Sequence, residues 1–201
     1  MGTSDLPDIR RSLFTAPDWN SVQQFDCGGA PYEQEVAAWI RGKDGEDSAL
    51  TSIAHPERPG RVWLYKLPDG TLIGFGALGY SEWRWKGKND PKVPVTLIIW
   101  VGLQREFQGK PEGVSKEHKY STMILNDLIK EAEKDKATHP VIGLLVHKDN
   151  VKAIKLYEWF GFAQGFEPIR NKETKEIEYI RMAVVLDDVS VLRFRDAAKK
   201  K

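Results

Sequence analysis

The chain has 201 residues, of which 41% are hydrophobic and 29% charged, the composition of an ordinary globular protein with room for one core. Lys and Arg number 30 against 29 Asp and Glu, so no global positive field attracts nucleic acid, although local clusters could. A single cysteine, Cys27, excludes an intramolecular disulfide, and no apolar run reaches the roughly 20 residues of a membrane helix. We therefore expect a cytoplasmic protein with no membrane segment.

The N-terminal part of the chain predicts two helices. The residues before Pro31 carry weak signals and end in a turn-like Cys-Gly-Gly sequence. Proline is favoured at the first position of a helix, so Pro31 predicts the start of a helix over 31–41. A second helix is expected over 46–54, because turn-forming proline sequences follow it.

A hairpin and a loop are expected next. The sequence Pro68-Asp69-Gly70 is typical of a turn and lies between two β-rich runs, which predicts antiparallel strands at 61–66 and 71–80. The polar stretch 81–94, with a glycine and two prolines, is expected to be a loop in which Trp83 is exposed.

The second half of the chain alternates strands and helices. Residues 95–103 form a long β-rich run that is apolar on both faces, which is typical of a central strand. A polar loop over 104–120, a helix over 121–136 and an apolar strand over 141–146 follow. Strands over 163–169 and 177–186 are expected to form a last hairpin around a charged turn.

This order predicts an α/β fold with a mixed, largely antiparallel central sheet flanked by helices. We expect one domain over 1–188 and a C-terminal tail over 189–201, which ends in three lysines.

The most informative segment is 150–162, which reads Asn-Val-Lys-Ala-Ile-Lys-Leu-Tyr-Glu-Trp-Phe-Gly-Phe. Asn150 is a suitable N-cap and Gly161 a suitable left-handed terminator, so both ends of one helix are marked. Its apolar residues recur at i, i+3, i+4 and i+7, which places them on one face. They are Ala153, Leu156, Tyr157 and Phe160.

The same segment fits the pattern Asn-x-x-Ala-x-x-Leu-Tyr-Glu-x-x-Gly-Phe at every fixed position. That pattern resembles the late motif of the GNAT family of N-acetyltransferases. The resemblance implies the mixed α/β fold described above and transfer of an acetyl group from acetyl-CoA, as co-substrate, to a primary amine. It also implies that Tyr157 is the general acid for the CoA thiolate, and that Asn150 and Ala153 lie beside the pantetheine arm.

The loop after the central strand departs from the family pattern. Phe107-Gln108-Gly109-Lys110 resembles the opening of the phosphate-binding loop, but eight residues intervene before Lys119-Tyr120-Ser121, which takes the place of Gly-x-Gly/Ala. In one interpretation the loop is an elaborated phosphate cradle to which Lys119 adds charge. In the other, cofactor affinity is lost and the fold binds something else.

The remaining candidate residues are less specific. The resemblance implies a backbone oxyanion donor near Leu103, where the central strand ends. Glu82 and Glu106 are the candidates for a general base, although an exposed Glu is most often simply solvated. The four histidines have no ligand spacing, so no metal site is expected.

The sequence leaves the acceptor open between a small-molecule amine and a protein amine. Phe25-Asp26-Cys27-Gly28 and the Trp39-Ile40-Arg41 helix faintly resemble acetyltransferase toxins that modify aminoacyl-tRNA, which keeps tRNA as an alternative partner. A third hypothesis is a non-catalytic acyl-CoA-binding or interaction module. A homodimer is also left open, because exposed Trp residues are common at such interfaces.

Overall fold

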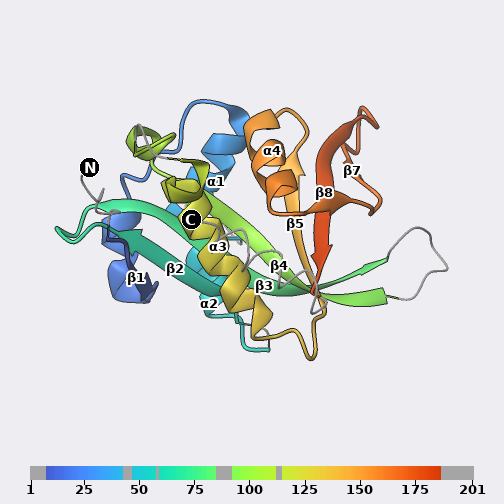
Figure 1. Ribbon diagram of the computed structural model, residues 1–201, viewed down its shortest axis with the longest axis horizontal. Coiled ribbons are helices and arrows are strands. Elements are labelled where there is room, and N and C mark those ends of the chain that lie inside the picture. Colours follow the sequence, from blue (N-terminus) through green and yellow to red (C-terminus); the bar gives the residue numbers. More distant parts are fainter. Residues whose placement is uncertain (1–7, 43–46, 58, 85–91, 112–114, 187–201) are drawn as a thin grey trace. The chain divides into compact units, whose positions relative to one another are not determined.

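The computed structural model describes residues 8–42, 47–57, 59–84, 92–111 and 115–186 (Figure 1). The chain divides into two compact units. Unit 1 comprises Met1–Ala77 and Trp100–Leu128, and unit 2 comprises Leu78–Ile99 and Ile129–Lys201. The expected domain boundary at residue 188 lies outside the described residues.

Within the described part of the chain, eight strands pair in the order β1-β2-β3-β4-β5-β8-β6, and β7 also pairs with β8. The strands are β1 Arg10–Leu13, β2 Arg61–Lys66, β3 Leu72–Arg84, β4 Lys92–Leu103, β5 Val141–His147, β6 Ala163–Gln164, β7 Ile169–Arg170 and β8 Ile177–Val185. β4 and β5 run parallel, whereas β1 pairs with β2, and β8 with β5, β6 and β7, in antiparallel fashion.

In the same described residues, four α-helices and three short 3-10 helices accompany the strands. They are α1 Pro31–Arg41, α2 Ala49–Ile53, α3 Tyr120–Glu133, α4 Val151–Trp159, η1 Ala16–Val22, η2 Arg105–Phe107 and η3 Lys116–His118. These elements confirm the expected α/β class, a mixed and largely antiparallel sheet flanked by helices. None of the described helices is long and apolar enough to cross a membrane.

The core of unit 1 is built around three aromatic rings. Trp39 of α1 stacks on Phe75 of β3 with 5.9 Å between ring centroids, and Phe25 meets the edge of Phe75 at 5.1 Å. All three side chains are buried. Aromatic pairs of this kind add to the gain from apolar burial, so they fix α1 and the segment before it against β3.

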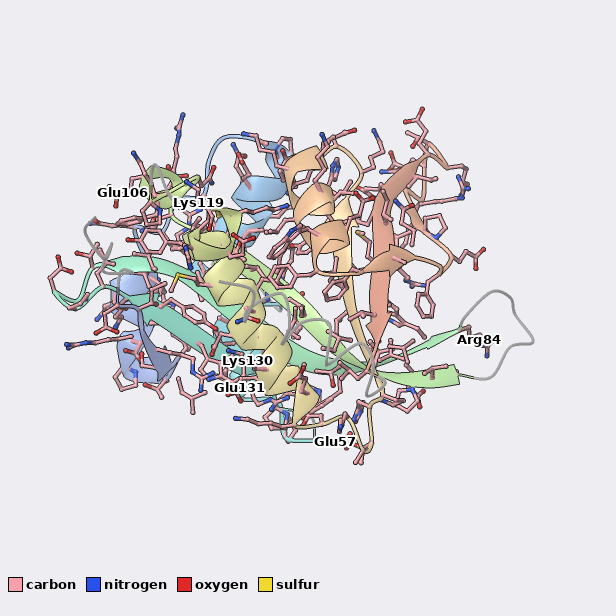
Figure 2. All side chains as sticks on the ribbon, in the orientation of Figure 1. Glu57, Arg84, Glu106, Lys119, Lys130 and Glu131 are labelled. Atoms are coloured by element: carbon pink, nitrogen blue, oxygen red, sulfur yellow. The ribbon has the colours of Figure 1, made fainter. Side chains whose placement is uncertain are left out.

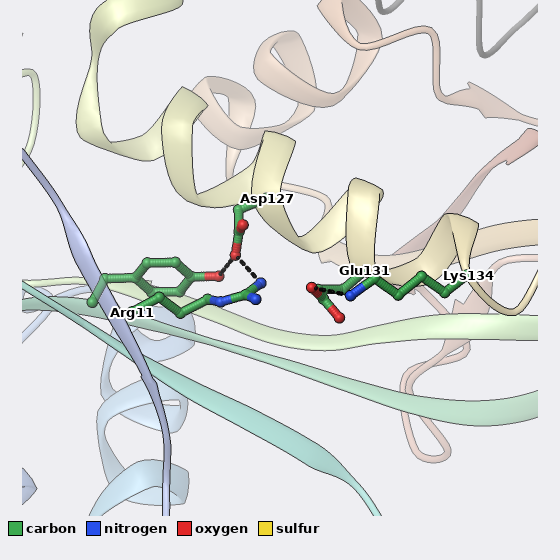
Figure 3. Close-up of polar contacts among 5 residues, drawn as sticks. Arg11, Asp127, Glu131 and Lys134 are labelled. Atoms are coloured by element: carbon green, nitrogen blue, oxygen red, sulfur yellow. Dashed lines mark hydrogen bonds and ion pairs between the residues drawn. The ribbon is translucent and has the colours of Figure 1, made fainter.

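One carboxylate of unit 1 joins three elements (Figure 3). Oδ2 of Asp127, on α3, accepts hydrogen bonds from the Tyr65 hydroxyl at 2.7 Å and from the Arg11 guanidinium at 2.9 Å. Tyr65 belongs to β2 and Arg11 to the edge strand β1. All four residues of β1 are exposed, and Arg11 also makes a cation–π interaction with the Trp63 ring. The Asp127 carboxylate therefore ties the weakly packed strand β1 to α3.

The core of unit 2 is organised by Trp83. Its side chain is 5% exposed and packs in one cluster with Val95, Val141, Phe166 and Ala183. Phe166 meets the indole edge-on at 5.0 Å, and the Arg181 guanidinium lies 5.5 Å from the ring centroid. The expectation of an exposed Trp83 was wrong.

Two expected elements differ from the structure for identifiable reasons. The predicted loop over 81–94 is wrong at both of its ends, because β3 continues to Arg84 and β4 begins at Lys92, with apolar burial of Trp83 outweighing the polar composition. Its middle part, 85–91, lies outside the described residues. The predicted strand over 163–169 is broken into β6 and β7. Gly165 and Pro168 lie between them, and both residues weaken or interrupt a strand ladder.

A β-carbon at Gly143 has no room in unit 2. It would lie 2.6 Å from ring carbons of Trp83 and 2.8 Å from a methyl group of Val95. We predict that Gly143→Ala lowers the free energy of unfolding by about 1–3 kcal/mol, because an indole fixed in a packed core cannot move aside without strain. Urea denaturation measures the change.

Gly165→Ala is the matched control, because a β-carbon there meets nothing within 4 Å. Its unfolding free energy should stay within about 0.5 kcal/mol of the unmodified chain. Equal effects of the two substitutions would contradict the packing assigned to Trp83.

Candidate functional site

Helix α4 of unit 2 carries the sequence signature, and its ends are formed as predicted. Oδ1 of Asn150 accepts a hydrogen bond from the backbone N–H of Ala153 at 3.1 Å, which is the contact of an N-cap. Gly161 adopts φ of +86°, a left-handed conformation that glycine reaches without a β-carbon clash. The position of Tyr157 on this helix is therefore fixed by contacts local to the helix.

The Tyr157 hydroxyl has no hydrogen-bond partner among the described residues. The ring lies 6.1 Å from that of Phe162, measured between centroids. Removal from water raises the pKa of Tyr157 to about 12, because a phenolate would lose its hydration there. A tyrosine that only fills a core normally has its hydroxyl satisfied. This hydroxyl is protonated at neutral pH and available to a ligand.

The loop between β4 and α3, in unit 1, is closed at its base. The backbone N–H of Tyr120 donates to the carbonyl oxygen of Lys110 at 3.0 Å. The Tyr120 side chain is buried and meets the edge of Phe107 with 5.7 Å between centroids. The residues on either side of the insertion therefore touch, so the insertion leaves the loop and returns to it at nearly the same point.

Lys119 completes this closure (Figure 2). Its ammonium donates to the carbonyl oxygen of Gly109 at 2.8 Å and also to that of Pro111. Gly109 itself adopts φ of +73°, which turns the chain at the start of the insertion. The structure thus brings Gly109, Lys110, Lys119 and Tyr120 together, although the sequence separates them into two pairs.

The start of α3 has the properties of an anion site. In the first turn, N–H groups of Ser121 and Thr122 have no acceptor among the described residues, as is usual for the first turn of a helix. Oγ1 of Thr122 is buried and also has no partner there, while the residue as a whole is 3% exposed. Unpaired amides at the end of a 14-residue helix, where the helix dipole is positive, fit a phosphate group.

Gln108 and Leu103 lie at the junction between β4 and this loop. The Gln108 side-chain amide donates to the carbonyl oxygen of Cys27 and lies 3.5 Å from that of Leu103. The β4 residues from Val95 to Ile98 pair with β5, and β4 then continues to Leu103. Because its side-chain amide is bonded to the Cys27 carbonyl oxygen, Gln108 braces the loop and is not turned outward toward a ligand.

A cavity of about 420 Å³ opens beside the end of β4 and is lined by Asp26, Gln104, Arg105 and Glu106. The backbone N–H of Arg105 donates to the Asp26 carbonyl oxygen at 2.8 Å, and the Asp26 N–H donates to Oε1 of Gln104 at 2.9 Å. The Glu106 carboxylate has no partner among the described residues (Figure 2). The sequence did not single out Asp26 for this site, because its partners lie 78 residues away.

The second candidate base, Glu82, is placed differently. It lies on β3 in unit 2, and its carboxylate forms an ion pair of 2.9 Å with Lys92 of β4. The predicted site residues thus fall into two sets. Unit 1 holds Leu103, Glu106, Gln108, Gly109, Lys110, Lys119, Tyr120 and Ser121, and unit 2 holds Glu82, Asn150, Ala153 and Tyr157. Among the described residues, no group of three or more His, Cys, Asp or Glu could hold a metal ion.

Comparison with known proteins identifies the family of this chain. The model of the Acetyltransferase (GNAT) family matches residues 30–162, and the chain therefore belongs to the GNAT acetyltransferase family. No curated protein matches the chain.

Three similar solved structures share the fold at low identity. A bacterial toxin has a TM-score of 0.61 at 15% identity, over 98% of each chain. The toxin AtaT, bound to acetyl-CoA and the C-terminus of the antitoxin AtaR, has a TM-score of 0.58 at 14% identity, over 92% of this chain and 98% of its own. A GNAT family acetyltransferase from Elizabethkingia anophelis, with acetyl-CoA bound, has a TM-score of 0.54 at 19% identity, over 91% of this chain and 100% of its own.

The raised pKa of Tyr157 gives a titration that can be measured. We predict that the tyrosinate absorbance of the unmodified chain minus that of Tyr157→Phe rises with a midpoint near pH 12. Between pH 10, the ordinary pKa of tyrosine, and pH 12, Tyr157 loses its hydroxyl proton in the unfolded chain and keeps it in the folded chain. The contribution of Tyr157 to stability is therefore complete below pH 10 and is lost as the pH rises toward 12, by up to about 1.4 kcal/mol per pH unit. A midpoint near 10 would show that the hydroxyl is well hydrated.

Proposed function

We propose that this protein transfers the acetyl group of acetyl-CoA to a primary amine, by direct attack of the amine on the thioester. The observation that carries the proposal is the Tyr157 hydroxyl, which sits on the capped signature helix, is protonated and has no partner among the described residues. Membership of the GNAT family supports acetyl-CoA as the acetyl donor.

The proposed reaction needs one proton at each end. The amine nitrogen forms a bond to the acetyl carbonyl carbon, the carbon–sulfur bond breaks, and the sulfur leaves with the electron pair of that bond. Tyr157 acts as general acid to this thiolate. A pKa near 12 makes the phenol a weak acid, so its hydrogen bond to the sulfur forms as negative charge develops and before the proton moves. Solvent then returns the proton to Tyr157.

The phosphate groups of acetyl-CoA are assigned to the closed loop of unit 1. The unpaired amides of Ser121 and Thr122 supply donors, and the α3 dipole favours negative charge there. Closure of the insertion by Tyr120 and Lys119 supports the elaborated cradle over the loss of cofactor affinity. Asn150 uses its side-chain oxygen as a cap, which leaves its amide N–H groups for the pantetheine arm.

Glu106 is the better candidate for the general base. Its carboxylate lines the cavity beside the end of β4. Another lining residue of that cavity directly follows Leu103, the proposed oxyanion donor, in the sequence. The Glu82 carboxylate already accepts a hydrogen bond from the Lys92 ammonium at 2.9 Å, which makes it the weaker candidate. The amine must be neutral to attack, so Glu106 takes its proton directly or through water.

Titration with acetyl-CoA and the Tyr157→Phe variant together test the proposal. We predict that calorimetry detects acetyl-CoA binding to both proteins, because the hydroxyl serves the departing thiolate. Thiol release with an amine acceptor should be about 10²-fold slower in the variant. No binding at millimolar acetyl-CoA would reject the proposal, and an unchanged turnover would remove Tyr157 from the mechanism.

The two candidate bases can be separated by matched substitutions. We predict that Glu106→Gln lowers kcat/KM by about 10²-fold, because no carboxylate is left to take the proton. Glu82→Gln should leave kcat/KM within about twofold of the unmodified chain. The reverse order of effects would assign the base to Glu82.

A second candidate is the same chemistry on the α-amine of aminoacyl-tRNA. The likeness in fold to two solved toxins, over at least 92% of this chain, is the observation that favours it. Growth arrest on expression, relieved by Tyr157→Phe, would support this acceptor, whereas normal growth with turnover of small amines would favour the first.

A further inference from the structure

The insertion between Gly109 and Tyr120 is held by three consecutive carbonyl oxygens. Those of Gly109 and Pro111 accept from the Lys119 ammonium, and that of Lys110 accepts from the Tyr120 N–H at 3.0 Å. In all three bonds the donor belongs to the pair Lys119–Tyr120 and the acceptor to Gly109–Pro111. The Lys119 side chain and the Tyr120 amide therefore hold the two ends of the insertion together, beside the contact between the Tyr120 and Phe107 rings.

This arrangement matters for a phosphate site because carbonyl oxygens carry partial negative charge. If the carbonyl oxygens of Gly109 and Pro111 were free, they would either repel a phosphate group at the start of α3 or compete for the same donors. Bound to an ammonium, they are neutralised. Charged donors give the stronger hydrogen bonds of this kind, about twice those of neutral donors.

A lysine at this position also needs explanation. Lys119 directly precedes the first residue of α3, where the helix dipole disfavours a positive charge by about 0.3–1 kcal/mol. A neutral or acidic residue would be better for the helix alone. The two carbonyl oxygens offset this cost, since the ammonium is bonded to them instead of standing free at the helix end.

We propose that Lys119 is a positioning residue for the phosphate-binding amides of this site: its side chain closes the insertion and so does the work of the glycine that the family pattern has at this place. The inference rests on the proposed function. Lys119 acts through the backbone it holds and does not itself contact the phosphate. It differs in this respect from the direct charge that the sequence alone predicts for it.

The test compares Lys119→Met with Lys130→Met, using CoA as the probe in calorimetric titrations of the full chain. Both substitutions remove one positive charge and keep an unbranched side chain, and Lys130 is an exposed residue further along α3 (Figure 2). We expect Lys119→Met to raise the Kd for CoA about tenfold and Lys130→Met to leave it within twofold.

Two further readouts separate positioning from direct contact. The slope of log Kd against log salt concentration should be the same in Lys119→Met and in the unmodified chain, because the substitution removes no positive charge that contacts the phosphate. Hydrogen exchange at the Tyr120 amide should be faster in Lys119→Met only, because its bond to Lys110 loses support. Lys119→Arg, which keeps charge and donors, should restore most of both properties.

Several outcomes would overturn the inference. A shallower salt slope in Lys119→Met would show that the ammonium contacts the phosphate directly. An unchanged Kd, with or without faster exchange at Tyr120, would make the closure a matter of loop structure only, while leaving the proposed function intact. Absence of CoA binding in the unmodified chain would remove the proposed function and this inference together.

Discussion

The hydrogen bond from the Tyr120 N–H to the Lys110 carbonyl oxygen is the contact on which the candidate phosphate loop of unit 1 depends. It joins Lys110, the residue before the insertion, to the first residue of α3. Burial of the Tyr120 ring against Phe107 keeps the donor in place, because the ring cannot leave without exposing apolar surface. The start of α3 is thereby fixed within unit 1, and the Ser121 and Thr122 amides have no acceptor among the described residues.

The candidate residues on α4 of unit 2 depend on a different constraint. No residue of α4 is fully buried, so packing contributes less to this helix than to α3. Its two ends instead supply the specificity, with Asn150 as the N-cap and Gly161 in the left-handed conformation. A helix held by its ends can present a partly exposed tyrosine without needing a partner for the hydroxyl. Asn150 and Gly161 therefore have structural roles at the ends of α4 that do not require contact with a ligand.

The sequence predicts well wherever a local contact determines the structure. The bounds of α1, β2 and α4 follow from a first-position proline, a turn and two caps, and the structure has them within one residue. It fails where a contact distant in sequence decides. Trp83 is buried by Phe166 and Val95, which its neighbours in sequence do not reveal. Asp26 lines the cavity and is held there by its own backbone, whose N–H donates to the Gln104 side chain and whose carbonyl oxygen accepts from the Arg105 N–H. The backbone groups of Asp26 leave no mark in the residue pattern.

The interrupted loop shows the same limit in a more useful form. Read along the sequence, Lys119 is an added charge at a position that should be glycine, and eight inserted residues look like damage to the phosphate site. In space, the two ends of the insertion lie close together, and the Lys119 ammonium donates hydrogen bonds to the carbonyl oxygens there. Glycine permits a close turn because it lacks a side chain. Lysine can instead stabilise one, because its ammonium donates hydrogen bonds to the carbonyl oxygens of the turn. Two residues of opposite character can therefore meet the same geometric requirement, and only the hydrogen bonds distinguish a degraded motif from a rebuilt one.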